Sequence, residues 1–295
     1  MEARGDGVDG DAGPSRAVPQ GAPITVFIAS WGRPLYLWAC LDALYRLTRT
    51  PARFVLLDNA HPDPLVGEVI LGFARRGMFD EVVRFRTNAL ANIATAYEAR
   101  LAGIGPLNVY IEADCVVVPE SGCWLGAMRE IMDRNPAIGM LGSVVDPSDF
   151  VPRERALRLT DGDVDRAEYL AKLNSVERAF LADPRWVEAA QDLVLTEPPF
   201  PVGNPPGRLM MLRTRVMQEV GFQVDDRLAL AMKARGLQAA VTARVRHRHL
   251  SLLNVYDHPG MDRAARNRFF SGESPGAPPG PRRSTGARRS ARGSR

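Results

Sequence analysis

The chain has 295 residues, 45% hydrophobic and 24% charged, which is typical of an ordinary globular protein with one large or two small domains. Six arginines lie between residues 282 and 295, and without them the formal net charge of +4 falls by six to −2. The three cysteines are odd in number and lack CxxC spacing, which argues against a disulfide framework or a zinc cage. No apolar run approaches the roughly 18 residues of a membrane-spanning helix, and the Gly- and Pro-rich start lacks the apolar part of a signal peptide. We therefore expect a cytoplasmic protein without a transmembrane segment.

Short apolar, β-branched runs alternate with longer helical segments along most of the chain. The runs predict strands at residues 24–29, 53–57, 81–86, within 107–119, and at 138–145, 208–213 and 238–245. The segments between them predict helices at residues 35–47, 65–76, 90–102, 121–134, 214–220 and 226–235. Because most strands are continuously apolar and are separated by helices, they predict an α/β fold with a mostly parallel central sheet and helices on both faces.

The ends of the chain and one internal stretch differ in composition from the rest. The expected layout is a disordered leader (1–22), one folded domain (23–270) with a first half (23–145), an inserted helical segment (146–196) and a second half (197–270), and a disordered Arg-rich tail (271–295). We interpret a predicted helix at 167–182 as a flap over the site. The tail has no aromatic residues between its arginines, so we expect no specific nucleic-acid binding, and a peripheral membrane contact is left open.

Polar side chains follow three of the predicted strands where each strand ends. They are Ser30, Trp31 and Arg33 after the first strand, Asp58 after the second, and Glu112 and Asp114 on the strand within 107–119. Ligands of parallel α/β sheets bind at the carboxyl ends of strands, so we expect one site there. Strand alternation predicts that Glu112 and Asp114 face the same side, and such a pair of carboxylates suits Mg²⁺ or Mn²⁺. The simpler alternative is a polar turn whose acids cap the next helix.

Five short motifs occur along the chain in one order. They are Ala29-Ser30-Trp31-Gly32-Arg33, Leu57-Asp58-Asn59, Glu112-Ala113-Asp114 before Val-x-Pro, the segment 208–221, and the segment 225–236. In order and spacing they resemble the motifs of the family 2 inverting glycosyltransferases of the GT-A fold, over residues 24–249. Three positions depart from the family pattern: Glu112 replaces the first Asp of the metal motif, Val224 stands where a Glu would precede the catalytic Asp, and Arg227 stands where a further Asp would follow it.

The resemblance implies a single GT-A, Rossmann-like domain that transfers a sugar, with inversion, from a UDP-, GDP- or dTDP-sugar to a glycan, lipid or small-molecule acceptor. Residues 23–145 would bind the nucleotide sugar, and residues 197–270 would bind the acceptor. The implied donor-site residues are Ser30, Trp31, Arg33, Asp58, Asn88, Glu112 and Ala113. Asp58 would accept from the nucleobase, Trp31 would flank the base and Arg33 would face a phosphate. A core aromatic residue and a helix-start arginine are the simpler alternatives for the last two.

The resemblance also implies a divalent cation, Mg²⁺ or Mn²⁺, with Asp114 as its main ligand. Glu112 would hold the ribose or a metal-bound water. Either His247 or His249 would complete the metal shell. These histidines alternate with arginines at a predicted strand end, so both face one way, and a purely structural histidine pair is the alternative.

The catalytic base implied by the resemblance is Asp225, with Asp226 as the alternative. An acid at the start of the predicted helix is also explained as its N-cap. Two other functions stay open: a catalytically inactive GT-A binding module, and a sugar nucleotidyltransferase. Against the latter, no Gly-rich loop follows the first strand to hold a triphosphate.

Overall fold

The structure is a computed structural model that describes residues 22–61, 63–119, 122–146, 153–159, 161–164, 193–196, 208–223 and 225–250. The strands are β1 (Ile24–Ser30), β2 (Ala52–Asp58), β3 (Glu81–Arg84), β4 (Leu107–Glu112), β5 (Cys115–Val117), β6 (Ile138–Val145), β7 (Val194–Thr196), β8 (Leu209–Arg213) and β9 (Gln238–His249). The helices are α1 (Pro34–Leu47), α2 (Pro64–Arg75), α3 (Leu90–Glu98), the 3₁₀ turn η1 (Leu101–Gly103), α4 (Trp124–Arg134), α5 (Arg153–Leu159), α8 (Thr214–Val220) and α9 (Asp225–Lys233). The predicted alternation of strands and helices is confirmed.

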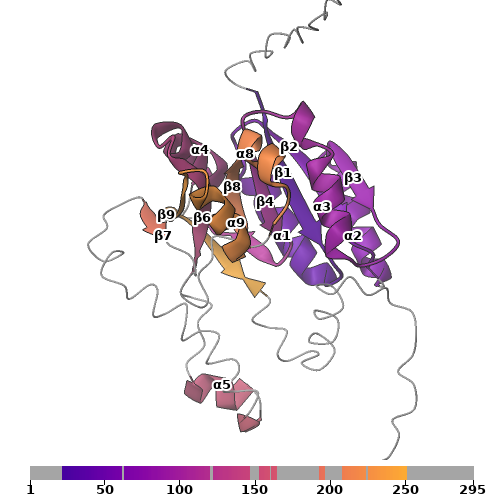
Figure 1. Cartoon of the computed structure of the whole chain (residues 1–295). Helices are drawn as coiled ribbons and strands as arrows, with labels where there is room; N and C mark the ends of the chain where they lie inside the picture. The colour runs from indigo at the N-terminus through magenta and orange to yellow at the C-terminus, as the bar shows by residue number, and fades with distance from the viewer. Residues whose placement is uncertain are drawn as a thin grey trace, which may run out of the picture.

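All strands belong to one nine-stranded sheet in the order β3-β2-β1-β4-β8-β6-β9-β5, with β7 paired to β9 (Figure 1). β1 to β4 run parallel to one another and β6 runs parallel to β9, and these parallel pairs include the longest ladders. β8 runs antiparallel between β4 and β6, and β5 runs antiparallel to β9. The ends of β1, β2, β4, β6 and β9 and the start of β8 therefore lie together. We call this side of the sheet the carboxyl edge.

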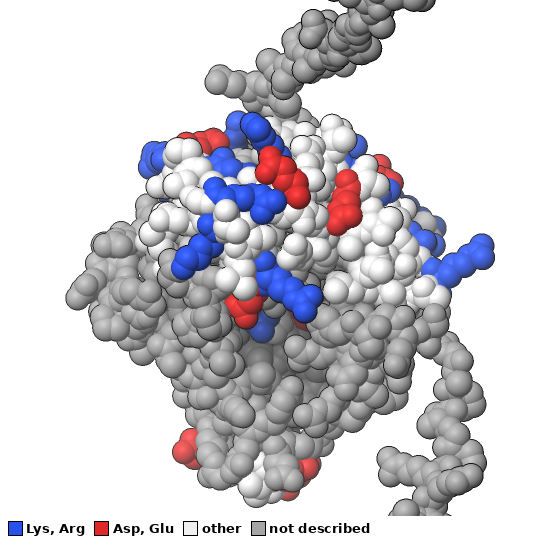
Figure 2. Space-filling view, viewed as in Figure 1, with Lys and Arg blue, Asp and Glu red and all other residues white. Residues whose placement is uncertain are grey.

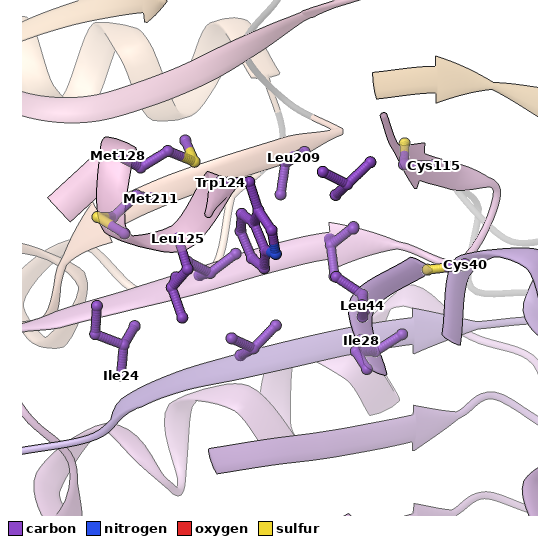
Figure 3. Packing of buried hydrophobic residues seen from close by; sticks show 14 of the residues in the cluster. Ile24, Ile28, Cys40, Leu44, Cys115, Trp124, Leu125, Met128, Leu209 and Met211 are labelled. Atoms are coloured by element: carbon purple, nitrogen blue, oxygen red, sulfur yellow. The ribbon is translucent and has the colours of Figure 1, made fainter. Parts of the chain in front are cut away.

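Helices cover both faces of the sheet, as predicted, and each face has its own core (Figure 1). Val26 and Ile28 of β1 pack in the core under α1, α2 and α4, whereas Phe27 packs in the core under α3, α8 and α9. This follows from the alternation of side chains along a strand. In the first core, the fully buried Trp124 of α4 belongs to the same cluster as Ile28 and Leu44 (Figure 3).

Two polar contacts, one partly buried and one buried, join the elements around β8. The Arg213 guanidinium donates to the carbonyls of Met132, Asn135 and Ile138, which close α4 and begin β6, at 2.7 to 3.0 Å. On the other face, the Tyr97 hydroxyl donates to Asn108 Oδ1 at 2.7 Å. Both contacts satisfy polar groups inside the protein, although the Asn135 carbonyl also accepts from Ile138 N.

The stretch 107–119 differs from the prediction, because it is not one strand. β4 ends at Glu112, the chain turns at Ala113 and Asp114, and β5 pairs with β9 on another part of the sheet. The turn is held by backbone hydrogen bonds from Ala113 N to the Ala29 carbonyl and from Leu250 N to the Asp114 carbonyl. The argument that strand alternation places both acids on one side is therefore wrong.

α5 and β7 were not among the predicted elements, and the remaining elements differ only in extent. β9 continues through His249, so both histidines lie inside a strand rather than after it. α3 stops at Glu98 and is followed by η1. Residues 1–21 of the predicted leader, the predicted helix 167–182 and the predicted tail 271–295 lie outside the described residues.

The described surface gives no sign of a membrane span. None of the helices in the described ranges is long and apolar enough to cross a bilayer. On the described part of the face in Figure 2, acidic and basic side chains are interspersed. Among the described residues of this face, the lysine and arginine side chains therefore do not form one broad basic patch.

Candidate functional site

The carboxyl edge brings together residues that lie far apart in the sequence. Ser30 on β1 is the register partner of Asp58 on β2, which in turn is the partner of Arg84 on β3. Glu112 on β4 lies beside Ala29, and its backbone N–H donates to the carbonyl of residue 208 at 2.9 Å. The predicted convergence of Ser30, Asp58 and Glu112 is thus observed.

Two loops at this edge contain residues in the left-handed region of backbone space. Gly32 and Arg33 after β1 have φ of 61° and 55°, and Ala60 after β2 has φ of 56°. For a residue with a Cβ this conformation costs about 1–3 kcal/mol, and such strain occurs most often at functional sites. Arg33 is the N-cap residue of α1, and its guanidinium lies 3.4 Å from Asp114 Oδ2.

Asp114 lies in the turn between β4 and β5, with little of its side chain exposed. The same Oδ2 that faces Arg33 lies 3.6 Å from His249 Nε2, because Cys115 and His249 are partners in the β5–β9 ladder. Burial by itself would raise the pKa of Asp114, but His249, Arg33 and Arg208 together hold this pKa well below its usual range. Asp114 is therefore an ionised carboxylate at neutral pH.

His247 is buried two residues before His249, on the same face of β9, as predicted. Burial, helped by the charges of His249 and Arg208, lowers the pKa of His247 to about 3, so its ring is neutral. Its Nδ1 lies 2.7 Å from the Ser143 hydroxyl, whereas its Nε2 is buried without a hydrogen-bond partner. A neutral imidazole with one unpartnered nitrogen is the form that binds metal ions.

Asp58 is the buried acid at the other end of the site. Its Oδ2 lies 3.3 Å from His61 Nε2 and 3.9 Å from Arg84 Nε, and its Oδ1 is buried without a hydrogen-bond partner. Burial raises the pKa of Asp58, and the opposing effects of His61 and Arg84 do not fully offset the increase. This carboxyl group therefore has one oxygen beside His61 and Arg84 and one that can accept from a ligand.

Asn88 was predicted at the donor site, and the structure joins it to the carboxyl edge through Asn59. The Asn59 amide donates to Asn88 Oδ1 at 2.7 Å, and its own oxygen accepts from Ala89 N and Asn92 Nδ2. Because Asn59 is buried directly after β2, it fixes the loop before α3 against the end of that strand.

The remaining predicted residues have different positions. Trp31 is half-buried at the end of β1, and Ala113 is buried in the turn before Asp114.

Asp225 and Asp226 are the first two residues of α9, and Asp226 is exposed. The C-terminal part of α9 lies at the opposite side of the sheet, where Met232 packs over Gly139 near the start of β6. Since α9 then leads into the start of β9, its N-terminus is directed toward the carboxyl edge.

Sequence reasoning placed Asn59 at a strand end beside Asp58 but missed three residues of the site: His61, Arg84 and Arg208. Arg84 ends the third parallel strand, so the rule that ligands bind at carboxyl ends applies to it as well. Arg208 precedes β8, and only the reversed direction of that strand places it beside Asp114. His61 follows Asp58 in a polar loop, but its contact with the acid depends on the turn at Ala60.

The donor set at Asp114 fits a divalent cation that also binds substrate. Within the described ranges, no three His, Cys, Asp or Glu side chains lie close enough together to form a metal site on their own. Mg²⁺ and related ions, however, are commonly held by one or two protein ligands plus substrate phosphates. Asp114, His249 at 3.6 Å and the unpartnered Nε2 of His247 supply such oxygen and nitrogen donors.

Comparison with known proteins adds evidence on the fold. No protein-family model and no curated protein matches the chain. A mannosyltransferase from Pyrobaculum calidifontis, solved with GDP-Man and Mn²⁺, matches with a TM-score of 0.51 and 16% identity over 88% of this chain and 65% of that one. Glucosyl-3-phosphoglycerate synthase from Mycobacterium tuberculosis matches with a TM-score of 0.44 and 16% identity over 83% of this chain and 77% of that one.

The chain thus spans 65% of the length of the mannosyltransferase. At 16% identity the likeness bears on the fold and not on the activity. Together with the sheet order and the helices on both faces, it shows that this chain has the α/β fold of a GT-A glycosyltransferase.

Proposed function

We propose that this chain is a metal-dependent glycosyltransferase of the family 2 type, which moves a sugar from a nucleotide-sugar donor to an acceptor hydroxyl with inversion. One observation carries the proposal. Among the described residues, four buried side-chain atoms lack a hydrogen-bond partner, and three of them, Ser30 Oγ, Asp58 Oδ1 and His247 Nε2, lie at the carboxyl edge. Leaving a buried polar atom unpaired costs about 1–3 kcal/mol, so three at one edge indicate a site built for a polar ligand.

The nucleotide sugar is assigned to this edge by charge and hydrogen-bonding capacity. Asp58 Oδ1 accepts an N–H of the nucleobase, and Trp31 and Ser30 line the same strand end. Arg33 and Arg208 place positive charge next to Asp114, where the diphosphate would bind. Glu112, Ala113 and Asn88 complete the donor half, residues 23–145.

Asp114, with His247 or His249, would hold the cation. When bound, Mg²⁺ or Mn²⁺ neutralises the charge that develops on the departing diphosphate. The protein supplies the rest of this charge balance, because Arg33 lies within 3.4 Å of Asp114 and Arg208 acts on the same carboxylate. Their guanidinium groups can hold the diphosphate oxygens as the bond to the sugar breaks.

The acceptor is assigned to the second half, residues 197–270, with the insertion 146–196 contributing to its recognition. Its hydroxyl oxygen attacks the anomeric carbon from the side opposite the diphosphate, which inverts the configuration. The hydroxyl proton passes to a carboxylate as the new bond forms, and we assign this role to Asp225, with Asp226 as the alternative. Both residues begin α9, whose N-terminus is directed toward the carboxyl edge.

A thermal-shift panel of UDP-, GDP- and dTDP-sugars, with and without Mn²⁺, tests the proposal. Stabilisation by one nucleotide class that needs Mn²⁺ and is lost in Asp114→Asn is the expected result. Asp133→Asn, which removes an exposed acid of α4 outside the site, is the matched control and should keep the response. Absence of stabilisation by every nucleotide sugar would overturn the proposal. Binding without donor hydrolysis or transfer would instead indicate an inactive binding module.

A further inference from the structure

The loop after β2 carries a histidine whose two ring nitrogens face different groups. His61 Nδ1 lies 2.8 Å from the Asp63 carbonyl oxygen, and Nε2 lies 3.3 Å from Asp58 Oδ2. The ring is mostly buried, with 17% of the side chain exposed. A structural role in the loop would explain the first contact but not the second.

The proton positions on this ring follow from its partners. A carbonyl oxygen can only accept, so Nδ1 carries a proton. If Nε2 then had only a lone pair, it would face the lone pairs of a carboxylate, which is repulsive. The contact is favourable when a proton lies between Nε2 and Oδ2. The pair Asp58–His61 thus holds one shared proton, and in either arrangement Oδ1 remains an acceptor.

We propose that His61 is a positioning residue of the nucleobase site, which holds Asp58 through Oδ2 so that Oδ1 is presented to an N–H of the base. This inference rests on the function proposed above. It names the base class as one with an N–H donor on its pairing edge, a uracil, thymine or guanine, and it adds a residue that acts on the base only through Asp58.

The local backbone supports a dedicated position for this ring. Ala60 has φ of 56°, a left-handed conformation that alanine seldom adopts, and its N–H closes a tight turn onto the Asp58 carbonyl at 3.0 Å. This turn directs His61 back over the preceding strand end. Arg84 is the other charged group that acts on Asp58, from β3, and at 3.9 Å it supplies charge without a hydrogen bond.

Two substitutions separate the contacts of the ring. In His61→Asn the amide can replace Nδ1 and donate to the Asp63 carbonyl, but it does not reach Asp58. In His61→Gln the longer amide can replace Nε2 and donate to Asp58, and it does not titrate.

Calorimetry with UDP, GDP and dTDP identifies the diphosphate that the wild type binds best. Two probes are compared with that nucleotide. The base-methylated analogue (N3-methyl for a pyrimidine, N1-methyl for guanine) keeps the base but lacks its N–H donor, and inorganic pyrophosphate has no base.

We expect His61→Asn to weaken binding of that nucleotide about tenfold or more and to discriminate less against the methylated analogue. Pyrophosphate binding, which involves no base, should persist in the same variant and shows that it is folded. His61→Gln should retain most of the nucleotide affinity.

Wild-type-like nucleotide binding by His61→Asn, or a loss of pyrophosphate binding together with the nucleotide, would overturn the role of His61 and leave the proposed function intact. Failure of the wild type to bind any of the three nucleotides would overturn the proposed function itself, and this inference with it.

Discussion

Replacing Asp58 or Asp114 by Asn should change the stability of the ligand-free protein in opposite directions, although both acids lie at the same edge. Each substitution keeps the shape of the side chain and removes its charge. We expect Asp58→Asn to stabilise the fold by about 1 kcal/mol and Asp114→Asn to destabilise it by about 3 kcal/mol.

The gain at Asp58 follows from its unpartnered oxygen. Burial raises the pKa of this carboxyl group, which means that the folded protein disfavours its ionised form. An unsatisfied buried acceptor costs about 1–3 kcal/mol, and part of the relief is lost with the ion pairs to His61 at 3.3 Å and Arg84 at 3.9 Å. About 1 kcal/mol remains.

The loss at Asp114 follows from its cationic neighbour Arg33. At 3.4 Å, the unit-charge contact with Arg33 is worth about 5 kcal/mol at an effective dielectric constant of about 20, before the cost of desolvation. Removing one member of a buried pair costs about 3–5 kcal/mol. Because 30% of the Arg33 side chain is exposed, the lower end of that range applies.

Urea unfolding at neutral pH, without metal or nucleotide, measures both effects. In thermal unfolding, the loss of about 3 kcal/mol expected for Asp114→Asn corresponds to a fall of about 6–12 °C in melting temperature. A raised folded-state pKa at Asp58 means that wild-type stability declines as pH rises above about 3.9, so the gain in Asp58→Asn should vanish in acid. Stability changes of the same sign in both variants would refute the assignment of Asp58 as an unsatisfied acceptor and Asp114 as a satisfied one.

Three further outcomes are expected. Arg213→Leu removes the Arg213 donors to the carbonyls of Met132, Ile138 and Asn135, of which Asn135 keeps a second donor in Ile138 N, and it should cost about 2–3 kcal/mol in urea unfolding; Arg215→Leu, with 91% of its side chain exposed, should stay within about 0.5 kcal/mol. Tyr97→Phe keeps the aromatic packing but removes the donor to Asn108, so it should lower stability by about 1–3 kcal/mol; an unchanged unfolding midpoint would contradict the importance of this hydrogen bond. Chelation with EDTA should abolish the thermal shift produced by the nucleotide sugar, and added Mn²⁺ should restore it; a shift that persists in EDTA would argue for cation-free binding.

The opposite signs expected for the two acids illustrate a general cost of function. A site that must accept a polar ligand keeps groups unsatisfied or strained in the ligand-free protein, as at Asp58 Oδ1 and Ala60. Substitutions that stabilise such a site tend to reduce its function. Asp58→Asn should therefore both stabilise the protein and weaken nucleotide binding.

The sequence alone determined the alternation of strands and helices, because burial on both faces leaves a continuous apolar pattern in each parallel strand. The sequence also places a glycine directly after each of the predicted helices 214–220 and 226–235. These residues, Gly221 and Gly236, have a positive φ of 71° beyond the ends of α8 and α9. The polar ends of the first strands, Ser30 and Asp58, were predictable for the same reason, since strand ends in such sheets form ligand sites.

Only the tertiary structure decided which side chains meet. The turn at Asp114 removes β5 from the line of β4 and pairs it with β9, which brings His249 to 3.6 Å from the acid. The antiparallel direction of β8 places Arg208 at the same edge. These contacts depend on pairing between segments distant in sequence, and no local pattern records that pairing. Asp58 and Asp114 were visible in the sequence as candidate site residues, but the charge environment of each was set by the sheet.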